Sequence, residues 1–203
     1  MERQLLNKGF HSIAGVDEVG RGALFGPVVS VSVAFPQDLL TDSPAEWLKE
    51  IDDSKSLSPK KRYYLAKHIL FNAQSLGIGF ASHTEIDKLN IYNASLTAMK
   101  RAVMNMPSKP DFLLIDGFQI NDVNYPQIGV LQGDRKCSVI AAASIVAKVL
   151  RDEVMHRLDK VYPGYGLGRH KGYATRSHYE SLERLGPTAL HRRSFRLGKK
   201  KQD

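Results

Sequence analysis

Four carboxylates stand in three separate parts of the sequence, each near an expected end of a strand or helix. Asp17 and Glu18 follow an apolar run and precede a Gly-Arg-Gly triplet, whereas Asp116 directly ends the run Phe-Leu-Leu-Ile. Asp134 follows a glycine just before a long apolar segment. Taken singly, each has an ordinary alternative as a turn residue or a solvated loop charge. Asp17 and Asp116 are the most informative, because a charge after a buried apolar run must reach water, a partner or a metal ion.

Convergence of these carboxylates would create strong mutual repulsion, for which a bound divalent cation is the usual remedy. All-oxygen ligation selects hard ions such as Mg²⁺ or Mn²⁺. Two such ions, roughly 4 Å apart, can position a water molecule and stabilise the leaving oxygen of a phosphodiester. The carboxylates therefore point to metal-dependent nuclease chemistry.

One geometric condition applies to Asp17 and Glu18. Successive side chains on a strand point to opposite faces of the sheet. The two carboxylates can therefore share a site only if the strand ends or bulges there, which the glycines that follow make possible.

The triplet Gly20, Arg21 and Gly22 is not a dinucleotide-binding motif, since it lacks a third glycine and leads into a strand. Glycines beside a carboxylate site let the backbone approach a nucleic acid closely. Its amides and carbonyls could then sense a ribose 2′-hydroxyl, the group that separates RNA from DNA. Tyr165 and Tyr173 lie in a later glycine-rich, basic segment, where they either stack on a substrate or pack to anchor the loop.

Basic residues dominate the chain, whose formal net charge is +8, and they gather near its C-terminus. From Arg169 onwards ten Lys and Arg face only three acids. Such a segment either tracks phosphates or forms a solvated tail, and for 199–201 both alternatives stay open. Lys55 precedes an expected helix, where it either belongs to a turn or contacts a phosphate.

Other kinds of site find little support in the sequence. His170, His178 and His191 lack a helical i, i+4 pair and have no cysteine partners, which argues against zinc. Cys137 is the only cysteine, so no internal disulfide forms, as is typical of the cytoplasm. The sequence shows no secretory signal and no apolar run long enough for a membrane span.

Apolar periodicity and capping residues predict an alternation of strands and helices. Strands are expected at 13–17, 28–35, 78–82, 111–116 and 127–131. Helices are expected from the Ser58 cap to about residue 74 with a stop at Gly77, from a Thr84 cap, and over 92–105, 138–160 and 177–185. This order indicates an α/β fold with a mixed sheet, since a tight glycine loop joins the first two strands. We expect a catalytic domain over 1–161 and a basic, mainly helical appendage over 162–203, within one compact unit.

The motifs taken together resemble the bacterial ribonuclease HII family, of the type 2 ribonucleases H. The resemblance covers nearly the whole chain in collinear order. The motifs that carry it are GVDEVGRG at 15–22, GPV at 26–28, DSKSL at 53–57, IDG at 115–117, GD at 133–134, IAAASIVAKV at 140–149, RD at 151–152, YPGYG at 162–166, KGY at 171–173 and HRRSF at 191–195.

The resemblance implies a ribonuclease H-like fold with a mixed five-stranded sheet flanked by helices. It implies a Mn²⁺- or Mg²⁺-dependent endonuclease that cuts the RNA strand of RNA–DNA hybrids, and ribonucleotides embedded in duplex DNA on their 5′ side. The expected products carry 3′-hydroxyl and 5′-phosphate ends. We expect a cytoplasmic monomer that does not bind membranes.

Residue by residue, the resemblance makes Asp17, Glu18, Asp116 and Asp134 the metal-binding carboxylates. It makes Gly20, Arg21 and Gly22 the loop that senses the 2′-hydroxyl. Tyr173 matches the tyrosine that packs against the next sugar and favours deoxyribose there, and Lys55 matches a phosphate-contacting lysine. Phe118 and Gln132 stand where the resemblance leads us to expect more polar and more basic residues.

Two alternatives remain at this point. One is another nuclease or strand-transfer enzyme on the same fold, which would also cut plain duplex DNA. The other is a non-catalytic nucleic-acid clamp that uses the basic C-terminal region, and it predicts binding without metal-dependent hydrolysis.

Overall fold

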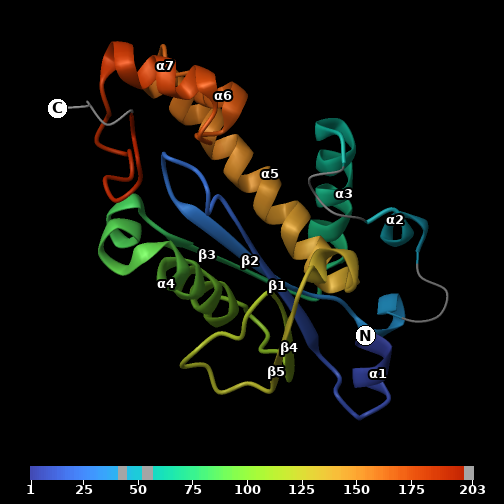
Figure 1. The fold of residues 1–203 in the computed structure, drawn as a ribbon. Helices are drawn as coiled ribbons and strands as arrows, with labels where there is room; N and C mark the ends of the chain where they lie inside the picture. Colours follow the sequence, from blue (N-terminus) through green and yellow to red (C-terminus); the bar gives the residue numbers. More distant parts are fainter. Residues whose placement is uncertain (41–44, 52–56, 199–203) are drawn as a thin grey trace.

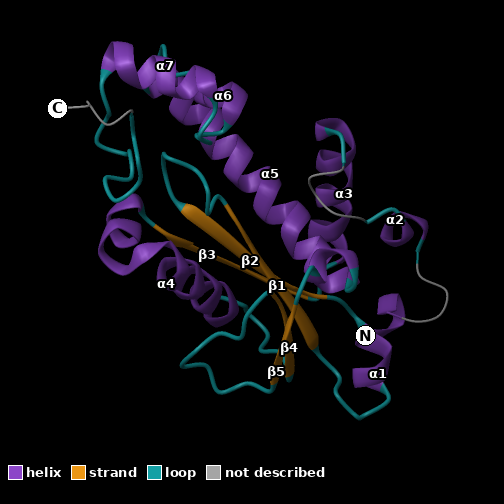
Figure 2. Cartoon of the chain, viewed as in Figure 1, coloured by secondary structure: helices purple, strands orange, loops and turns teal. Residues whose placement is uncertain are grey.

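The computed structural model describes residues 1–40, 45–51 and 57–198. A five-stranded sheet with the order β3-β2-β1-β4-β5 forms its centre (Figures 1 and 2). β2 is antiparallel to both β1 and β3, whereas β4 is parallel to both β1 and β5. The predicted α/β class with a mixed five-stranded sheet is confirmed. The strands are β1 (Ile13–Val19), β2 (Val28–Ala34), β3 (Ser75–Ala81), β4 (Phe112–Asp116) and β5 (Gln127–Val130).

Helices cover both faces of the sheet. α3 and α5 pack on one face against side chains such as Val31 and Leu114, and α4 packs on the other against Val16 and Ile115. Figure 1 shows α5 running diagonally across the sheet. The helices are α1 (Glu2–Leu6), η1 (Gln37–Leu40), α2 (Glu46–Lys49), α3 (Pro59–Asn72), α4 (His83–Met104), η2 (Gly133–Arg135), α5 (Ser138–Val161), α6 (Leu167–His170) and α7 (Arg176–Leu185).

β1 alternates its side chains between these two layers. Val16 belongs to the apolar cluster on the α4 side, so Gly15 and Asp17 face α5. A Cβ at Gly15 would overlap the backbone of Val139 in α5. The missing side chain lets α5 lie directly on β1, which brings the helix close to Asp17.

The prediction that Gly77 stops the helix that begins at the Ser58 cap is wrong. Ser58 does cap α3, since its hydroxyl accepts from the Lys61 N–H at 3.3 Å, but the helix ends at Asn72. Gly77 lies inside β3, where a Cβ would overlap the Ala102 carbonyl of α4. The glycine serves close strand–helix packing, a need that depends on a segment distant in the sequence.

The start of α4 also differs from the prediction. The cap is Ser82 and not Thr84, because the Ser82 hydroxyl accepts from the Glu85 N–H at 3.2 Å and Glu85 accepts from the Ser82 N–H at 2.9 Å. This reciprocal capping box fixes the first turn. The two predicted helices form one element with a kink at Asn90, whose φ is 66°. Asn tolerates this left-handed conformation better than most residues.

Two short helices near the N-terminus, α1 and α2, were not predicted, because neither has a periodic apolar pattern of useful length. α1 nevertheless reaches the sheet layer. Glu2 is buried, and its carboxylate accepts from the Val139 N–H at 3.2 Å in the first turn of α5. A residue far away in the sequence thus supplies the cap that Cys137 at the N-cap does not provide.

The C-terminal region hydrogen-bonds to the loop between β1 and β2. The Leu24 N–H donates to the Gly172 carbonyl at 2.8 Å, and the Gly26 N–H donates to the Leu190 carbonyl at 3.0 Å. Asp87 at the start of α4 accepts from the Arg193 and Ser194 N–H groups at 2.9 and 2.8 Å. In Figure 1 this terminal segment, in red, lies beside α4, in green. Residues 162–198 are therefore tied to the rest of the fold at two places, the β1–β2 loop and the start of α4.

β3 forms one outer edge of the sheet, and side chains of α4 cover part of that edge. The Arg101 guanidinium donates to the Phe80 carbonyl at 2.7 Å, and the Asn105 amide donates to the Ile78 carbonyl at 2.9 Å. Exposed strand edges otherwise offer unpaired backbone groups to other chains.

Gly15→Ala tests the close approach of β1 and α5. The added methyl must displace the Val139 backbone, so we expect the free energy of unfolding to fall by about 1–3 kcal/mol. Urea unfolding followed by circular dichroism measures this change. Gly198→Ala, at a position with open space around it, is the control. An unchanged urea midpoint for Gly15→Ala would refute the packing argument.

Candidate active site

Asp17 and Asp116 end up side by side at the centre of the sheet. β1 and β4 are parallel neighbours with Val16 paired to Ile115, and each carboxylate is the next residue in its strand. Both face the α5 side, since their predecessors belong to the cluster on the α4 side. Asp17 is only 5% exposed, and Asp116 is half-buried.

Glu18 joins them without the strand break that the sequence analysis required. β1 continues in regular register with β2 through Glu18, which pairs with Ser30, so the predicted end or bulge is absent. Glu18 instead lies just beyond the last β1–β4 pair. Burial is the main cause that raises the Glu18 pKa, the Arg21 charge opposes it, and the Asp116 charge adds to it. The charges of Glu18 and Asp116 both act on Asp17, and the Asp116 charge acts on Glu18, so the three carboxylates lie close together without a bulge.

Asp134 is placed by its neighbour Gly133. The Gly133 N–H donates to Asp116 Oδ1 at 2.7 Å, and a Cβ at Gly133 would overlap the Ile140 side chain. η2, which contains Asp134, follows β5 and leads into α5. Asp134, which is half-buried, is therefore adjacent in the chain to a group in contact with the Asp116 carboxylate.

Burial is the dominant cost of charge at Asp17. Its pKa is raised well above the ordinary value, first by burial and then by the charges of Glu18 and Asp116. Hydrogen bonds from the Ser144 hydroxyl and from the Glu18 N–H, at 2.6 Å, act in the opposite direction. The ionised carboxylates therefore destabilise one another unless positive charge is supplied.

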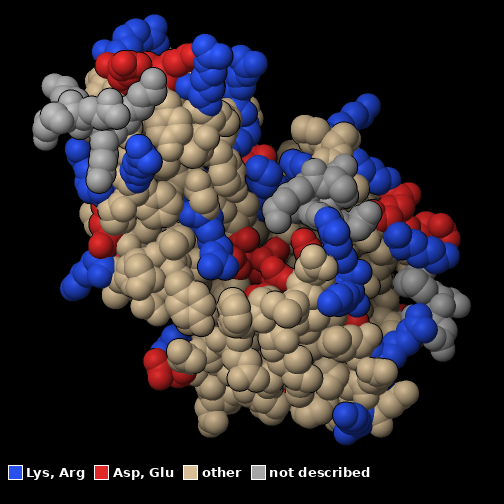
Figure 3. All heavy atoms as spheres, viewed as in Figure 1, with Lys and Arg blue, Asp and Glu red and all other residues tan. Residues whose placement is uncertain are grey.

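The residues suit a hard divalent cation by their chemistry. Glu18 Oε2 is buried and has no hydrogen-bond partner among the described residues, so it is available as a ligand. Within the described ranges, no three Asp, Glu, His or Cys side chains already form a set that could hold an ion. Binding a cation would therefore require side-chain rotations toward a common point. Figure 3 shows acidic side chains gathered in a hollow near the centre of this face, with Lys and Arg on both sides.

Two fully buried arginines hold the glycine loop from behind. Arg192 donates to the carbonyls of Gly20, Arg21 and Gly26 at 2.8, 2.8 and 2.9 Å. Arg151 of α5 donates to the carbonyls of Phe25, Pro27 and Lys171 at 3.1, 3.1 and 2.9 Å. Arg192 was expected among the bases that track phosphates, and this is wrong. Its guanidinium group donates hydrogen bonds to backbone carbonyls inside the protein.

The loop consequently turns its carbonyls inward and leaves part of its backbone open. Gly20 has a φ of +96°, and a Cβ there would overlap the Arg151 side chain. Gly22 is exposed and has open space around its Cα. The N–H groups of Arg21 and Gly22 donate to no acceptor in the described part of the chain. Arg21 also pairs with Glu18, with Nη1 and Oε1 3.2 Å apart, which joins the loop to the carboxylates.

Tyr173 lies next to this loop, and it is partly exposed. It forms a β-bridge with Ala23, and its ring centroid lies 5.4 Å from Arg151 Cζ and 5.8 Å from Lys148 Nζ. Tyr165, by contrast, is buried and donates its hydroxyl to the Gly186 carbonyl at 2.6 Å. Of the two alternatives considered for these tyrosines, packing describes Tyr165, whereas Tyr173 is placed where a substrate can reach it.

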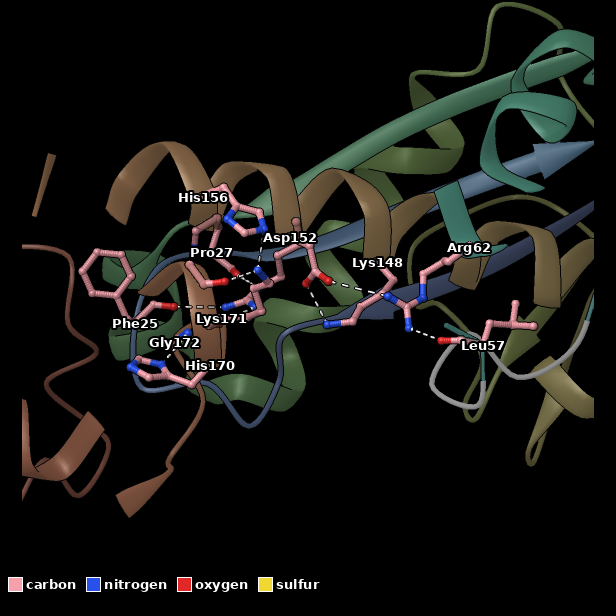
Figure 4. A network of polar contacts seen from close by, with 12 residues as sticks. Phe25, Pro27, Leu57, Arg62, Lys148, Asp152, His156, His170, Lys171 and Gly172 are labelled. Atoms are coloured by element: carbon pink, nitrogen blue, oxygen red, sulfur yellow. Dashed lines mark hydrogen bonds and ion pairs between the residues drawn. The ribbon is translucent and has the colours of Figure 1, made fainter. Parts of the chain in front are cut away.

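Sequence reasoning did not assign a role to the polar residues of α5 that line the same region. Lys148 Nζ lies 2.7 Å from Asp152, which lies 3.7 Å from Arg62 Nη1 (Figure 4). Arg62 also donates to the Leu57 carbonyl at 2.8 Å. Ser144, Lys148 and Arg151 recur at helical spacing, the first two within the apolar half of the helix, and this was the available signal.

The remaining basic residues divide into several groups. Arg176 pairs with Glu180 at 2.8 Å, and Arg184 donates to the Gly164 carbonyl at 3.0 Å. Arg169, Arg193 and Arg196 are exposed. Lys55 and residues 199–201 lie outside the described residues, so their predicted phosphate contacts stay predictions.

Comparison with known proteins supports one family for this arrangement. The family model "Ribonuclease HII" matches residues 14–197. Ribonuclease HII of Dehalococcoides mccartyi is 47% identical over 194 residues, which cover 96% of this chain and 90% of that protein. The fold is similar to the crystal structure of ribonuclease H2 from Pyrococcus horikoshii OT3, with a TM-score of 0.74, 24% identity and coverage of 92% and 94%. Bst-RNase HIII in complex with Mn²⁺ has a TM-score of 0.63 and 18% identity, with coverage of 91% and 67%.

Asp17→Asn should raise the free energy of unfolding in the absence of divalent cations. The folded-state pKa of Asp17 is raised, so ionisation costs folding free energy as pH rises from the unfolded value through the folded one. A neutral amide removes this cost, and at pH 8 we expect a gain of about 1–3 kcal/mol. Urea unfolding in chelator measures it.

Asp122→Asn is the matched control, because Asp122 is exposed and its positive φ of 57° suits Asn. Its stability should not change measurably. A loss of stability in Asp17→Asn, with Asp122→Asn unchanged, would contradict the electrostatic account of the site.

Proposed function

This chain belongs to the ribonuclease HII family, and from that premise we propose that it is a metal-dependent endoribonuclease acting on RNA paired with DNA. It hydrolyses the RNA strand of hybrids and cuts on the 5′ side of ribonucleotides embedded in duplex DNA, leaving 3′-hydroxyl and 5′-phosphate ends. The observation that carries the proposal is the buried Asp17 beside the half-buried Asp116 on adjacent strands, joined to the glycine loop through Glu18 and Arg21.

Asp17, Glu18, Asp116 and Asp134 are the proposed ligands of Mn²⁺ or Mg²⁺. Glu18 has a buried oxygen with no hydrogen-bond partner in the part of the chain that the structure describes, and the pKa values of Asp17 and Glu18 are raised; both features favour cation binding there. The Mn²⁺ complex of the related ribonuclease HIII is consistent with this choice. Bound divalent ions supply an activated water and stabilise charge on the phosphodiester oxygens.

Recognition of the ribonucleotide is assigned to Gly20, Arg21 and Gly22. Arg192 holds the loop carbonyls inward, so the loop cannot satisfy its own exposed amides by folding back. The N–H groups of Arg21 and Gly22 have no acceptor among the described residues, so they can donate to a 2′-oxygen. A deoxyribonucleotide lacks that acceptor, and the fixed donors would then stay unpaired, which costs about 1–3 kcal/mol per buried group.

Tyr173 is assigned to the sugar that follows the ribonucleotide. Its ring lies beside the loop and is flanked by Arg151 and Lys148, so its position is well defined. A flat aromatic face packs well on an unsubstituted deoxyribose and leaves no partner for an additional hydroxyl. Lys148 is only 16% exposed and, with Lys55 in the same role as predicted from sequence, contributes positive charge for the phosphates.

The cell location and the oligomeric state of this protein are also proposals. No helix among the described residues is long and apolar enough to cross a membrane. Cys137 is buried, and burial raises the pKa of its thiol to about 12, so this single cysteine does not call for an oxidising compartment. We place the enzyme in the cytoplasm as a monomer.

Asp116→Asn should abolish cleavage of a duplex that carries one ribonucleotide. Loss of one ligand charge removes the cation site, and we expect the turnover rate to fall at least about a hundredfold. Gel analysis of an end-labelled duplex in Mn²⁺ measures it, with Asp122→Asn as the control that keeps normal activity. Near-normal turnover of Asp116→Asn would exclude the mechanism.

Plain duplex DNA serves as the second substrate in the same assay. Its cleavage by the wild-type protein would favour a different nuclease on the same fold. Binding of the ribonucleotide duplex without any hydrolysis would favour a nucleic-acid clamp.

Addition of Mn²⁺ should raise the thermal midpoint of the wild-type protein. Relief of the repulsion among the buried carboxylates stabilises the folded state by about 3 kcal/mol at a hundredfold excess over Kd, which corresponds to roughly 5–10 °C. Differential scanning calorimetry against a chelator blank measures the shift. The shift should disappear in Asp17→Asn and persist in Asp122→Asn; equal shifts in both would place the ion elsewhere.

A further inference from the structure

Three histidines lie together directly behind Tyr173. His178 and His191 are completely buried, and His170 is 9% exposed. The His170 and His178 rings stack with centroids 4.3 Å apart, and the Nε2 atoms of His178 and His191 are 3.2 Å apart. Neither the carboxylate site nor the glycine loop uses these side chains, so their arrangement calls for a separate explanation.

The hydrogen bonds fix which nitrogen of each ring carries a proton. His191 Nδ1 accepts from the Thr188 N–H at 2.9 Å, so the His191 proton is on Nε2. That proton must point to His178 Nε2, which leaves the His178 proton on Nδ1. His178 Nδ1 then donates to the Tyr173 carbonyl at 3.0 Å. The result is a directed chain of hydrogen bonds from Thr188 through two rings to the Tyr173 backbone.

Both rings must be neutral for this chain to exist, because His191 Nδ1 and His178 Nε2 each accept a hydrogen bond and therefore carry no proton. Burial is the first cause that lowers the pKa of His191 to about 4, and the charges of His178 and Arg193 add to it. Burial also lowers the pKa of His178, with the His170 charge acting in the same direction. Neutral imidazoles are therefore the stable forms at pH 7.

The backbone before Tyr173 takes an unusual conformation at Lys171. Its φ is 54°, in the left-handed region that a residue with a side chain rarely adopts, whereas the φ of 78° at Gly172 is ordinary for glycine. The Gly172 N–H donates to His170 Nδ1 at 3.2 Å, and the Tyr173 N–H donates to the His170 carbonyl at 3.0 Å. A left-handed residue that is not glycine persists only where its surroundings enforce it. His170 and Arg151 hold this backbone immediately before Tyr173, since His170 accepts from Gly172 and Arg151 donates to the Lys171 carbonyl at 2.9 Å.

We propose that His178 and His191 are positioning residues for Tyr173, and that they set the selectivity for the sugar following the ribonucleotide. The chain of rings holds the Tyr173 carbonyl, while the Arg151 and Lys148 cations lie near its ring. Tyr173 is thereby held in one orientation toward the substrate. This inference rests on the proposed function, since it assigns the histidines to Tyr173 and not to the cleavage chemistry.

His178→Asn and His178→Gln form the matched pair of variants for the test. The Asn amide nitrogen occupies roughly the place of the His Nδ1 and keeps the donor to Tyr173, whereas the Gln amide extends toward His191 and loses that donor. Both residues are polar, uncharged and similar in size. A role in packing alone would affect them alike, and urea unfolding shows whether both variants fold.

The readout is the ratio of kcat/KM on two duplexes, in which the ribonucleotide is followed either by a deoxynucleotide or by a second ribonucleotide. We expect the wild-type protein and His178→Asn to prefer the deoxynucleotide, and His178→Gln and Tyr173→Ala to lose about tenfold of that preference. The double variant H178Q/Y173A should be no worse than Tyr173→Ala. The effects of the two changes are non-additive if they act through one side chain.

Three results would overturn the inference. An unchanged preference in His178→Gln while Tyr173→Ala loses it would overturn the histidine role and leave the proposed function intact. Equal losses in the Asn and Gln variants, or multiplicative losses in the double variant, would reduce the histidines to packing. Absence of cleavage by the wild-type protein would refute the proposed function, and this inference with it.

Discussion

Repulsion among carboxylates buried at the ends of two adjacent strands is the constraint around which this molecule is built. Asp17 and Asp116 occupy the centre of the sheet, where water cannot screen them fully, and Glu18 adds a third charge. The fold tolerates this cost because the strands are held on both faces by extensive apolar clusters. A site of this kind trades stability for affinity toward cations, as is common where function requires strained electrostatics.

The carboxylates proposed for the chemistry and the loop proposed for recognition come from different parts of the chain that meet at the glycine loop. The sheet supplies the carboxylates, whereas α5 and the C-terminal region supply Arg151 and Arg192, which hold the loop in shape. Burial lowers the pKa of Arg192 to about 9, and the nearby Arg151 charge contributes to this. Each guanidinium is satisfied by three carbonyls in place of an acid. Their planar, fork-like donors suit this task in a way that lysine would not.

The sequence predicted the features that depend on neighbours along the chain. Asp17 and Asp116 were recognisable because each directly follows an apolar run, and Ser58 because a cap followed by proline is a local signal. The prediction was wrong where the role of a residue depends on a segment that is distant in the sequence. Gly77 is a residue type that commonly ends helices, yet it is needed for packing against α4. Arg192 is a residue type that usually lies on the surface, yet it is fully buried. Such roles exist only once the chain has folded back on itself.

The covered edge of β3 has a consequence for how this protein meets other molecules. Carbonyls of Ile78 and Phe80 already accept hydrogen bonds from α4, so a foreign strand that approaches finds few backbone acceptors there. Sheet-to-sheet polymerisation through this side is thereby disfavoured even in crowded solution. The side chains of Phe80 and Ile78 are 58% and 41% exposed on this same edge, where their carbonyls are already occupied. A partner that binds this side must therefore recognise it through contacts with individual side chains.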